Sequence, residues 1–155
     1  MPLFGKRLSP RKLKAMLGRE IGLSDWFPIT QERIDAFAAA TEDRQWIHVD
    51  QKRAARSPLG GTIAHGFLLL SLVPFFNDRN EVFAGRFRMA VNYRLDRVRF
   101  PQSVMAGQRV RNRAVLKRIE KRGFRKVLVT VENTTEVEGA EKPAMVADVL
   151  ALIYL

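Results

Sequence analysis

The chain has 155 residues, in which 27 lysines and arginines outnumber 16 aspartates and glutamates, for a net charge of +11. This length fits a single domain, and a 46% share of apolar residues excludes a disordered polycation. The absence of cysteine excludes disulfides, thiolate nucleophiles and cysteine-ligated metal sites. Because only His48 and His65 could add imidazole ligands, we expect no metal site, and the lack of cysteine fits a reducing cytoplasm.

The N-terminal third of the chain predicts two helices. Residues 6–20 carry six cations and one anion and predict a basic amphipathic helix after Pro10, so we interpret residues 1–22 as a basic helical extension. A short extended stretch follows at 26–29. Thr30 then caps a second helix that runs to about Ala40, with an apolar stripe of Ile34, Phe37 and Ala38.

The middle of the chain combines an irregular loop with a very apolar helix. Residues 41–61 predict a loop that contains a short helix opening at Asp50 and a turn at 57–61. Residues 62–76 have no polar face, which is typical of a helix surrounded by protein. Because Ser71 and Pro74 interrupt this run, we expect no membrane span, and the N-terminus has no apolar stretch of signal-peptide length.

The second half of the chain predicts strands. Alternation at 86–95 indicates a half-buried strand with Phe87, Met89, Val91 and Tyr93 on one side, and a further strand signal lies at 97–100. Residues 108–121 and 124–137 predict a hairpin, and 144–155 an interior strand. A sheet of about five antiparallel strands can bury the apolar helix only by curling around it, so we expect an α+β hotdog fold.

Two groups of residues are candidates for chemistry. Asp43 and His48 lie five residues apart in the loop, and such a pair around one water can transfer protons without a metal or cofactor. The glycine-containing segment 60–66 opens the apolar helix, where unpaired backbone N–H groups could hold an oxyanion and a glycine would allow a carbonyl to approach closely. The alternative interpretations are a capping or surface pair for Asp43 and His48, a flexible hinge for the glycines, and a structural role for His65.

The two groups belong to one longer stretch, ATEDRQWIHVDQKRAARSPLGGTIAHGFLLLSL, which resembles the hydratase motif of the MaoC-like dehydratases, or (R)-specific enoyl-CoA hydratases. It is most similar to the nodulation protein N subgroup, and the later segment VNYRLDRVRFPQSV resembles the same subgroup. The resemblance implies one hotdog domain over residues 1–155. The sequence departs from the broader family motif at Glu42, at Gln45 and Trp46, and at Pro74, where some hydratases have a serine.

The resemblance also implies a reaction and a site. It makes Asp43 and His48 the catalytic pair and the Gly66 N–H the group that binds the thioester carbonyl, with Trp46, Ile63 and His65 as tentative pocket residues. The implied reaction is reversible hydration of a trans-2-enoyl-CoA to a (3R)-hydroxyacyl-CoA. We accordingly expect an acyl-CoA thioester as substrate, no cofactor, and a homodimer whose sheets join edge to edge.

Other functions fit parts of the pattern. A non-catalytic acyl-CoA-binding protein or a thioesterase could use the same fold. The net charge would suit nucleic acid, but the arginine-rich strands contain few of the aromatic residues that such a surface uses, so we expect no nucleic-acid partner. The charge also suits the phosphates of CoA, and the arginines at 86–99 and 109–126 are candidates for contacting them unless they form a solvated strand face.

Overall fold

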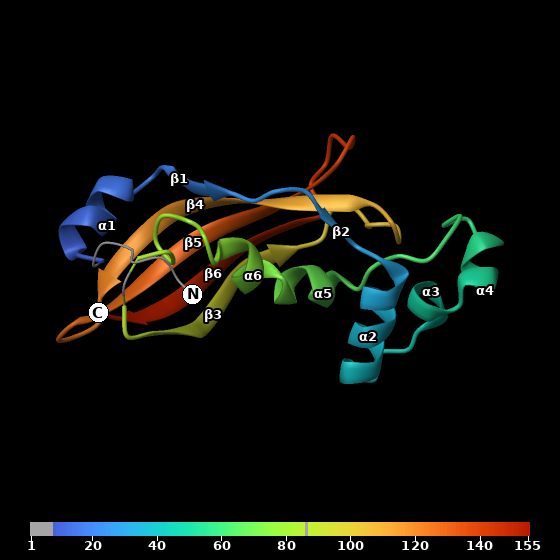
Figure 1. Cartoon of the computed structure of the whole chain (residues 1–155), viewed down its shortest axis with the longest axis horizontal. Helices are drawn as coiled ribbons and strands as arrows, with labels where there is room; N and C mark the ends of the chain where they lie inside the picture. The colour runs from blue at the N-terminus through green and yellow to red at the C-terminus, as the bar shows by residue number, and fades with distance from the viewer. Residues whose placement is uncertain (1–7, 86) are drawn as a thin grey trace.

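The structure, a computed structural model, describes residues 8–85 and 87–155 and is built on one antiparallel sheet (Figure 1). Five strands follow the order β1-β4-β5-β6-β3, and β2 also pairs with β4. The α+β hotdog prediction is therefore confirmed, with six strands in place of about five. The strands are β1 (Glu20–Leu23), β2 (Phe27–Pro28), β3 (Met89–Arg99), β4 (Arg109–Lys121), β5 (Lys126–Val137) and β6 (Met145–Tyr154).

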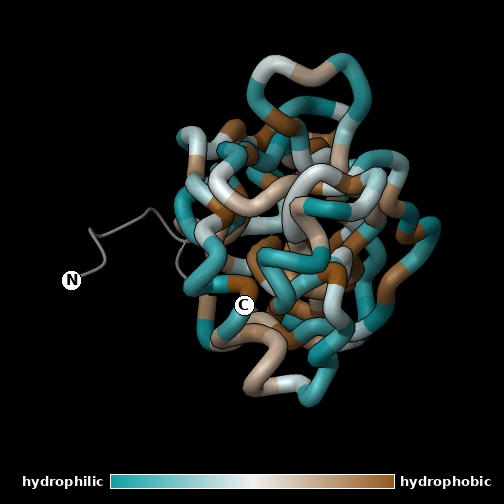
Figure 2. The backbone as a smooth tube through the Cα atoms, turned by 90° about the vertical axis from the view of Figure 1, so that its right-hand side faces the viewer, coloured by the Kyte–Doolittle hydropathy of each residue, from teal (hydrophilic) through white to brown (hydrophobic). Residues whose placement is uncertain are grey.

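The centre of the sheet agrees with the expected strands. β4 and β5 form the predicted hairpin, with Val110 opposite Val137 at one end and Lys121 opposite Val127 at the other. β6 lies between β5 and β3, as expected for a strand whose sequence is almost continuously apolar. Viewed along the long axis, the hydrophobic segments gather in the interior and the hydrophilic segments lie around them (Figure 2).

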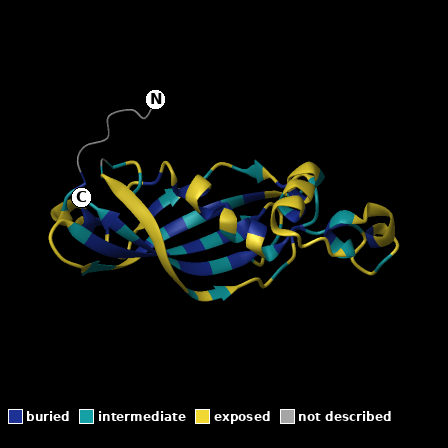
Figure 3. Cartoon of the chain, turned by 90° about the horizontal axis from the view of Figure 1, so that it is seen from below, coloured by how far each residue is buried: buried dark blue, intermediate teal, exposed yellow. Residues whose placement is uncertain are grey.

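The strand β3 differs from its prediction in two ways. The two expected segments at 86–95 and 97–100 form one strand, interrupted by irregularities in its pairing with β6, and Arg86 lies outside the described residues. The expected half-buried face is wrong for the single chain, because β3 is an edge strand and is exposed along most of its length (Figure 3). Met89, Val91, Tyr93 and Leu95 are all exposed.

The apolar segment at 62–76 forms two short helices, α5 (Gly66–Ser71) and α6 (Val73–Asn77), rather than one. Leu68, Leu69, Val73 and Phe76 are buried. The prediction that protein surrounds this segment is wrong for the single chain, because Phe67 is 67% exposed and Phe75 is 57% exposed. One sheet covers one side of a helix, so the other side needs a further layer.

The N-terminal helix is shorter than its basic segment. α1 (Pro10–Met16) is capped by Ser9, and residues 1–7 lie outside the described part of the chain. Leu13 and Met16 are buried, but Leu17 is 48% exposed. The sequence did not indicate β1, which begins inside the expected helical extension and pairs with β4.

The remaining helices gather at one end of the molecule (Figure 1). α2 (Gln31–Thr41) begins as predicted at the Thr30 cap, whose hydroxyl accepts the Arg33 N–H at 3.2 Å. α3 (Trp46–Val49) lies in what we expected to be loop, and α4 (Gln51–Ala55) confirms the short helix that opens at Asp50. Within the described residues, no helix is both long and apolar enough to cross a bilayer.

A cluster of three buried asparagines connects the helical layer to the sheet. The Asn77 side chain from α6 donates to Asn133 Oδ1 of β5 at 2.8 Å, and Asn112 of β4 donates to the same oxygen at 2.9 Å. All three residues are buried. Because buried amides are costly unless paired, the cluster fixes how α6 lies on the sheet.

Candidate active site

The segment between α2 and α5 carries nearly all of the candidate residues. α2 ends at Glu42, whose left-handed backbone (φ 63°) turns the chain into Asp43. α3 then carries His48 on its last turn, and Asp50 ends α3 while its carboxylate accepts the Arg53 N–H to start α4. Two short helices separated by one residue thus place His48 against the start of α5.

His48 is buried and its orientation is defined by one backbone contact. Its Nδ1 lies 2.7 Å from the Ile63 carbonyl oxygen. A carbonyl oxygen can only accept, so Nδ1 carries the proton and donates, which leaves Nε2 as an acceptor. Burial lowers the pKa of His48; the Ile63 hydrogen bond and nearby Asp43 raise it, and His65 lowers it further. The net direction is downward, which keeps the imidazole neutral at neutral pH.

His65 is the N-cap of α5 and connects His48 to the loop that bears Asp43. Its ring stacks on the His48 ring, with 3.7 Å between centroids and 23° between planes. Its Nε2 lies 2.9 Å from the Asp43 carbonyl oxygen and donates to it. Within the described part of the chain, the buried Nδ1 of His65 has no hydrogen-bond partner. His65 thus holds the backbone of Asp43 close to the His48 ring.

The structure brings the predicted pair together with His65. One atom that could bind a ligand, a carboxylate oxygen of Asp43 or a ring nitrogen of His48 and of His65, lies within 4.8 Å of the corresponding atoms of the other two residues. These are groups that could approach a cation, and they could equally surround a water molecule. One ring nitrogen of each imidazole already donates to a backbone carbonyl, so only the other ring nitrogen of each can contact a bound cation or water.

Gly66 is the first residue of α5, and a close neighbour explains why it is glycine. A Cβ built at this position would lie 3.1 Å from the Phe100 ring. No acceptor among the described residues receives a hydrogen bond from the Gly66 N–H. The segment before it is held by hydrogen bonds to residues 104–106, with Ala64 N donating to Val104 O at 2.8 Å and Ala106 N to Thr62 O at 2.9 Å. The Gly66 N–H is therefore held in place and free to bind.

The other two predicted pocket residues have different surroundings. Ile63 is half-buried and pairs with Met105, while its carbonyl orients His48. Trp46 points toward α4, where the Arg53 guanidinium lies 4.3 Å from the centre of its ring. Trp46 contributes to a surface hollow with Asp50, Lys52, Arg53, Arg56 and Ser57.

Sequence reasoning missed Gln31, which supports the site from α2. Its Nε2 donates to the His48 carbonyl at 2.8 Å, and its Oε1 accepts the Thr62 hydroxyl. It therefore connects the helix of His48 to the segment that leads to Gly66. No sequence signal identifies it, since the residues it joins are 17 and 31 positions away.

Two adjoining apolar hollows extend from α5 and α6 toward β3. The larger one, of about 610 Å³, is lined by Leu70, Val73 and Pro74 of the helical segment and by Tyr93 and Leu95 of β3. The second, of about 260 Å³, shares Val73 and Pro74 and continues to Phe83, Phe87 and Val91. An alkyl chain would be favoured in such surroundings.

Comparison with known proteins identifies the family. The MaoC like domain matches residues 12–139. The chain is 48% identical over 136 residues to 3-hydroxyacyl-thioester dehydratase Z of Mycobacterium tuberculosis, covering 88% of this chain and 89% of that protein. It is 44% identical over 147 residues to nodulation protein N of Rhizobium leguminosarum bv. viciae, covering 94% and 91%. The resemblance inferred from the motifs is confirmed.

A solved structure agrees with the fold. The (R)-hydratase from A. caviae involved in PHA biosynthesis superposes with a TM-score of 0.72 at 20% identity, covering 87% of this chain and 94% of that one. The family match and the dehydratase relative support hydratase or dehydratase chemistry, the reaction class of a hydro-lyase. This chain belongs to the MaoC-like dehydratase family.

Proposed function

We propose that this protein is an (R)-specific enoyl-CoA hydratase that adds water reversibly to a trans-2-enoyl-CoA to give a (3R)-hydroxyacyl-CoA. The observation that carries the proposal is the buried, neutral His48, whose Nδ1 is held by the Ile63 carbonyl and whose Nε2 is left to accept a proton beside Asp43. A neutral imidazole with a defined tautomer is what a general base at neutral pH requires.

The reaction follows from the electronic structure of the thioester. Its carbonyl is conjugated with the C2–C3 double bond, so water adds at C3 while negative charge collects on the carbonyl oxygen. The Gly66 N–H binds that oxygen and stabilises the enolate. Asp43 and His48 take one proton from the water as its oxygen bonds to C3, and return one proton to C2, so the enzyme is regenerated without a metal or cofactor.

The apolar hollows beside α5 and α6 support a direction for the acyl chain. With the thioester carbonyl at Gly66, the chain runs along Leu70 and Val73 toward β3, where the lining is mostly apolar. Pro74 stands in this wall, where some family members have a serine, so no hydroxyl at this position orients the chain.

Hydration of crotonyl-CoA tests the proposal directly. We expect the enoyl absorbance to fall without release of free thiol, and the product to be the (3R) isomer on a chiral column. Free thiol would instead identify a thioesterase, and binding without turnover across a series of C4 to C16 enoyl-CoA substrates would identify a non-catalytic acyl-CoA-binding protein. Either result would overturn the proposal.

We also propose that the protein is a homodimer joined along β3. Among the described strands, β3 pairs only with β6, which leaves its other edge free. Its exposed side chains Met89, Val91, Tyr93 and Leu95 are apolar, and exposed apolar edge strands are normally covered. A second copy paired edge to edge would cover them.

Sedimentation measures this assembly. We expect the wild type to sediment as a dimer and Val91→Lys, which places a charge in the middle of the strand, to sediment as a folded monomer. Lys117→Glu on β4, away from β3, is the control and is expected to remain dimeric. A wild-type monomer at micromolar concentration would contradict the proposed dimer.

A further inference from the structure

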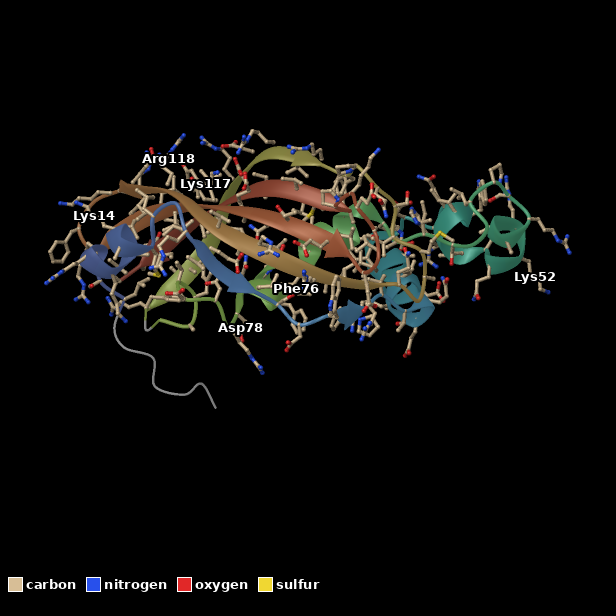
Figure 4. All side chains as sticks on the ribbon, turned by 90° about the horizontal axis from the view of Figure 1, so that it is seen from above. Lys14, Lys52, Phe76, Asp78, Lys117 and Arg118 are labelled. Atoms are coloured by element: carbon tan, nitrogen blue, oxygen red, sulfur yellow. The ribbon has the colours of Figure 1, made fainter. Side chains whose placement is uncertain are left out.

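A cationic hollow lies on the surface beside the catalytic helix α3. It has a volume of about 600 Å³ and is lined by Trp46, Asp50, Lys52, Arg53, Arg56 and Ser57. Trp46 lies two residues before His48 on the same four-residue helix, so the hollow adjoins the candidate active site. Lys52, on α4, stands at the end of the molecule farthest from Lys14, Lys117 and Arg118 (Figure 4).

The cations of this hollow are available to a ligand. Within the described residues, no carboxylate lies within ion-pair distance of Lys52, Arg53 or Arg56. The one acidic residue that lines the hollow, Asp50, uses its carboxylate to accept the Arg53 N–H at 2.9 Å. The hollow therefore has a positive local charge.

Several of the arginines that the sequence suggested for CoA phosphates are already paired. Arg109 donates to Glu138 at 2.7 Å, and Arg111 and Arg113 both donate to Glu136, at 2.7 and 2.9 Å. Arg94 and Arg97 pair with Asp96 and Asp148. These side chains form a strand face of ion pairs, so an anion would have to displace a carboxylate to bind there.

The proposed position of the thioester determines the direction in which the CoA portion of the bound substrate extends. The carbonyl binds at Gly66, at the start of α5, and the acyl chain extends toward β3 along Leu70 and Val73. The pantetheine arm, on the other side of the thioester, must then extend away from α5 and α6. α3 and α4 lie in that direction, beyond the start of α5 (Figure 1).

We propose that this hollow binds the 3′-phosphoadenosine diphosphate end of CoA; the inference rests on the proposed enoyl-CoA hydratase function. Lys52 and Arg56 contact phosphate oxygens, since both carry donors that suit phosphate. The Arg53 guanidinium, 4.3 Å from the centre of the Trp46 ring, offers a planar cation on which adenine can stack. The hollow therefore recognises the nucleotide part of CoA, while Gly66 and the catalytic pair act on the thioester.

A comparison of two substrates measures how much the nucleotide part of CoA contributes to binding. Crotonyl-CoA and crotonyl-pantetheine share the thioester and differ in the phosphates and adenosine. The double variant Lys52→Gln/Arg56→Gln removes two charges and leaves Arg53 on Trp46 undisturbed. The matched control is Lys14→Gln/Arg118→Gln, which removes one lysine and one arginine from the opposite end of the molecule (Figure 4).

For the Lys52/Arg56 variant, which loses two contacts, we expect the KM for crotonyl-CoA to rise by at least about tenfold, the size of one lost charge-assisted contact, with little change in kcat. Its kinetics with crotonyl-pantetheine should match those of the wild type, and the control should match the wild type with both substrates. Equal losses with both substrates, unchanged kinetics with crotonyl-CoA, or the same loss in the control would each overturn the inference.

A binding measurement keeps the inference separate from the reaction. Adenosine 3′,5′-bisphosphate carries phosphates and adenine but no thioester, so its calorimetric titration does not depend on turnover. We expect the wild type to bind it and the Lys52/Arg56 variant to bind it at least about tenfold more weakly. If the wild type hydrates no enoyl-CoA, the proposed function fails; if it hydrates crotonyl-CoA but does not bind the bisphosphate, the inference alone fails.

Discussion

Replacing His48 by glutamine separates its chemical role from its structural role. His48 Nδ1 donates to the Ile63 carbonyl at 2.7 Å, and the side-chain amide of glutamine can donate to the same oxygen. The amide is not a base at neutral pH, so His48→Gln keeps the contact that holds the loop and removes the proposed proton acceptor. His48→Ala removes both.

The expected sizes of the two effects differ. Losing general-base assistance lowers turnover by roughly 10²–10⁴-fold, and both variants should show this loss. For His48→Gln the change in the free energy of unfolding stays within about 1.5 kcal/mol, because the hydrogen bond is replaced rather than lost. Both variants remove the ring on which His65 stacks, but His48→Ala also leaves the Ile63 carbonyl without its donor, at a cost of about 1–3 kcal/mol for the unpaired group.

Two assays measure these quantities independently. Loss of the enoyl absorbance of crotonyl-CoA gives turnover, and urea denaturation gives the free energy of unfolding, with the slope m as a check that the unfolding transition is unchanged. The reasoning would be refuted by a His48→Gln protein that keeps wild-type turnover. A His48→Gln protein as unstable as His48→Ala would instead refute the role assigned to the Ile63 contact.

Four further predictions concern the same site. Asp43→Asn keeps the shape of the side chain and the carbonyl that His65 contacts, so turnover should fall by about 10²-fold or more while the thermal midpoint stays unchanged; near-normal activity would remove Asp43 from the mechanism. Because the pKa of His48 is lowered, kcat/KM should stay level as the pH falls to about 6.5 and decline below it. In the same pH range His48 binds a proton more readily in the unfolded chain than in the folded chain. His48 therefore makes the protein less stable as the pH drops below about 6.5, and the urea concentration at the unfolding midpoint should fall with it. Chelation by EDTA should leave activity unchanged, whereas a loss that added zinc restores would place a metal between Asp43, His48 and His65.

The parts of the site that the sequence could predict are those that lie close together in the chain. Asp43 and His48 share one loop, and the cap residues Thr30 and Asp50 act on helices that begin beside them. Those interactions depend on local spacing, which a single sequence contains. The stacking of His65 on His48 and the double contact of Gln31 depend on how distant segments meet, and no spacing rule reports that.

The errors in the fold have a related cause. Alternation along β3 correctly indicated an apolar face, but a pattern of residues does not say whether the same chain or another one covers that face. The apolar stretch of α5 and α6 was misjudged for the same reason, since Phe67 and Phe75 are exposed in the single chain. The pairing of Arg109 with Glu138 likewise depends on the strand register, which composition alone does not contain.

The buried asparagine cluster constrains how this protein can change over time. Asn77, Asn112 and Asn133 come from three separate elements, and their buried side-chain amides hydrogen-bond to one another. A single replacement by leucine would deprive each of the other two buried amides of a hydrogen-bond partner, whereas three simultaneous apolar replacements could be tolerated. We therefore expect homologous chains to keep all three amides or none, so that these positions vary as a group, and Asn77→Leu to be rescued only when both partners are replaced as well.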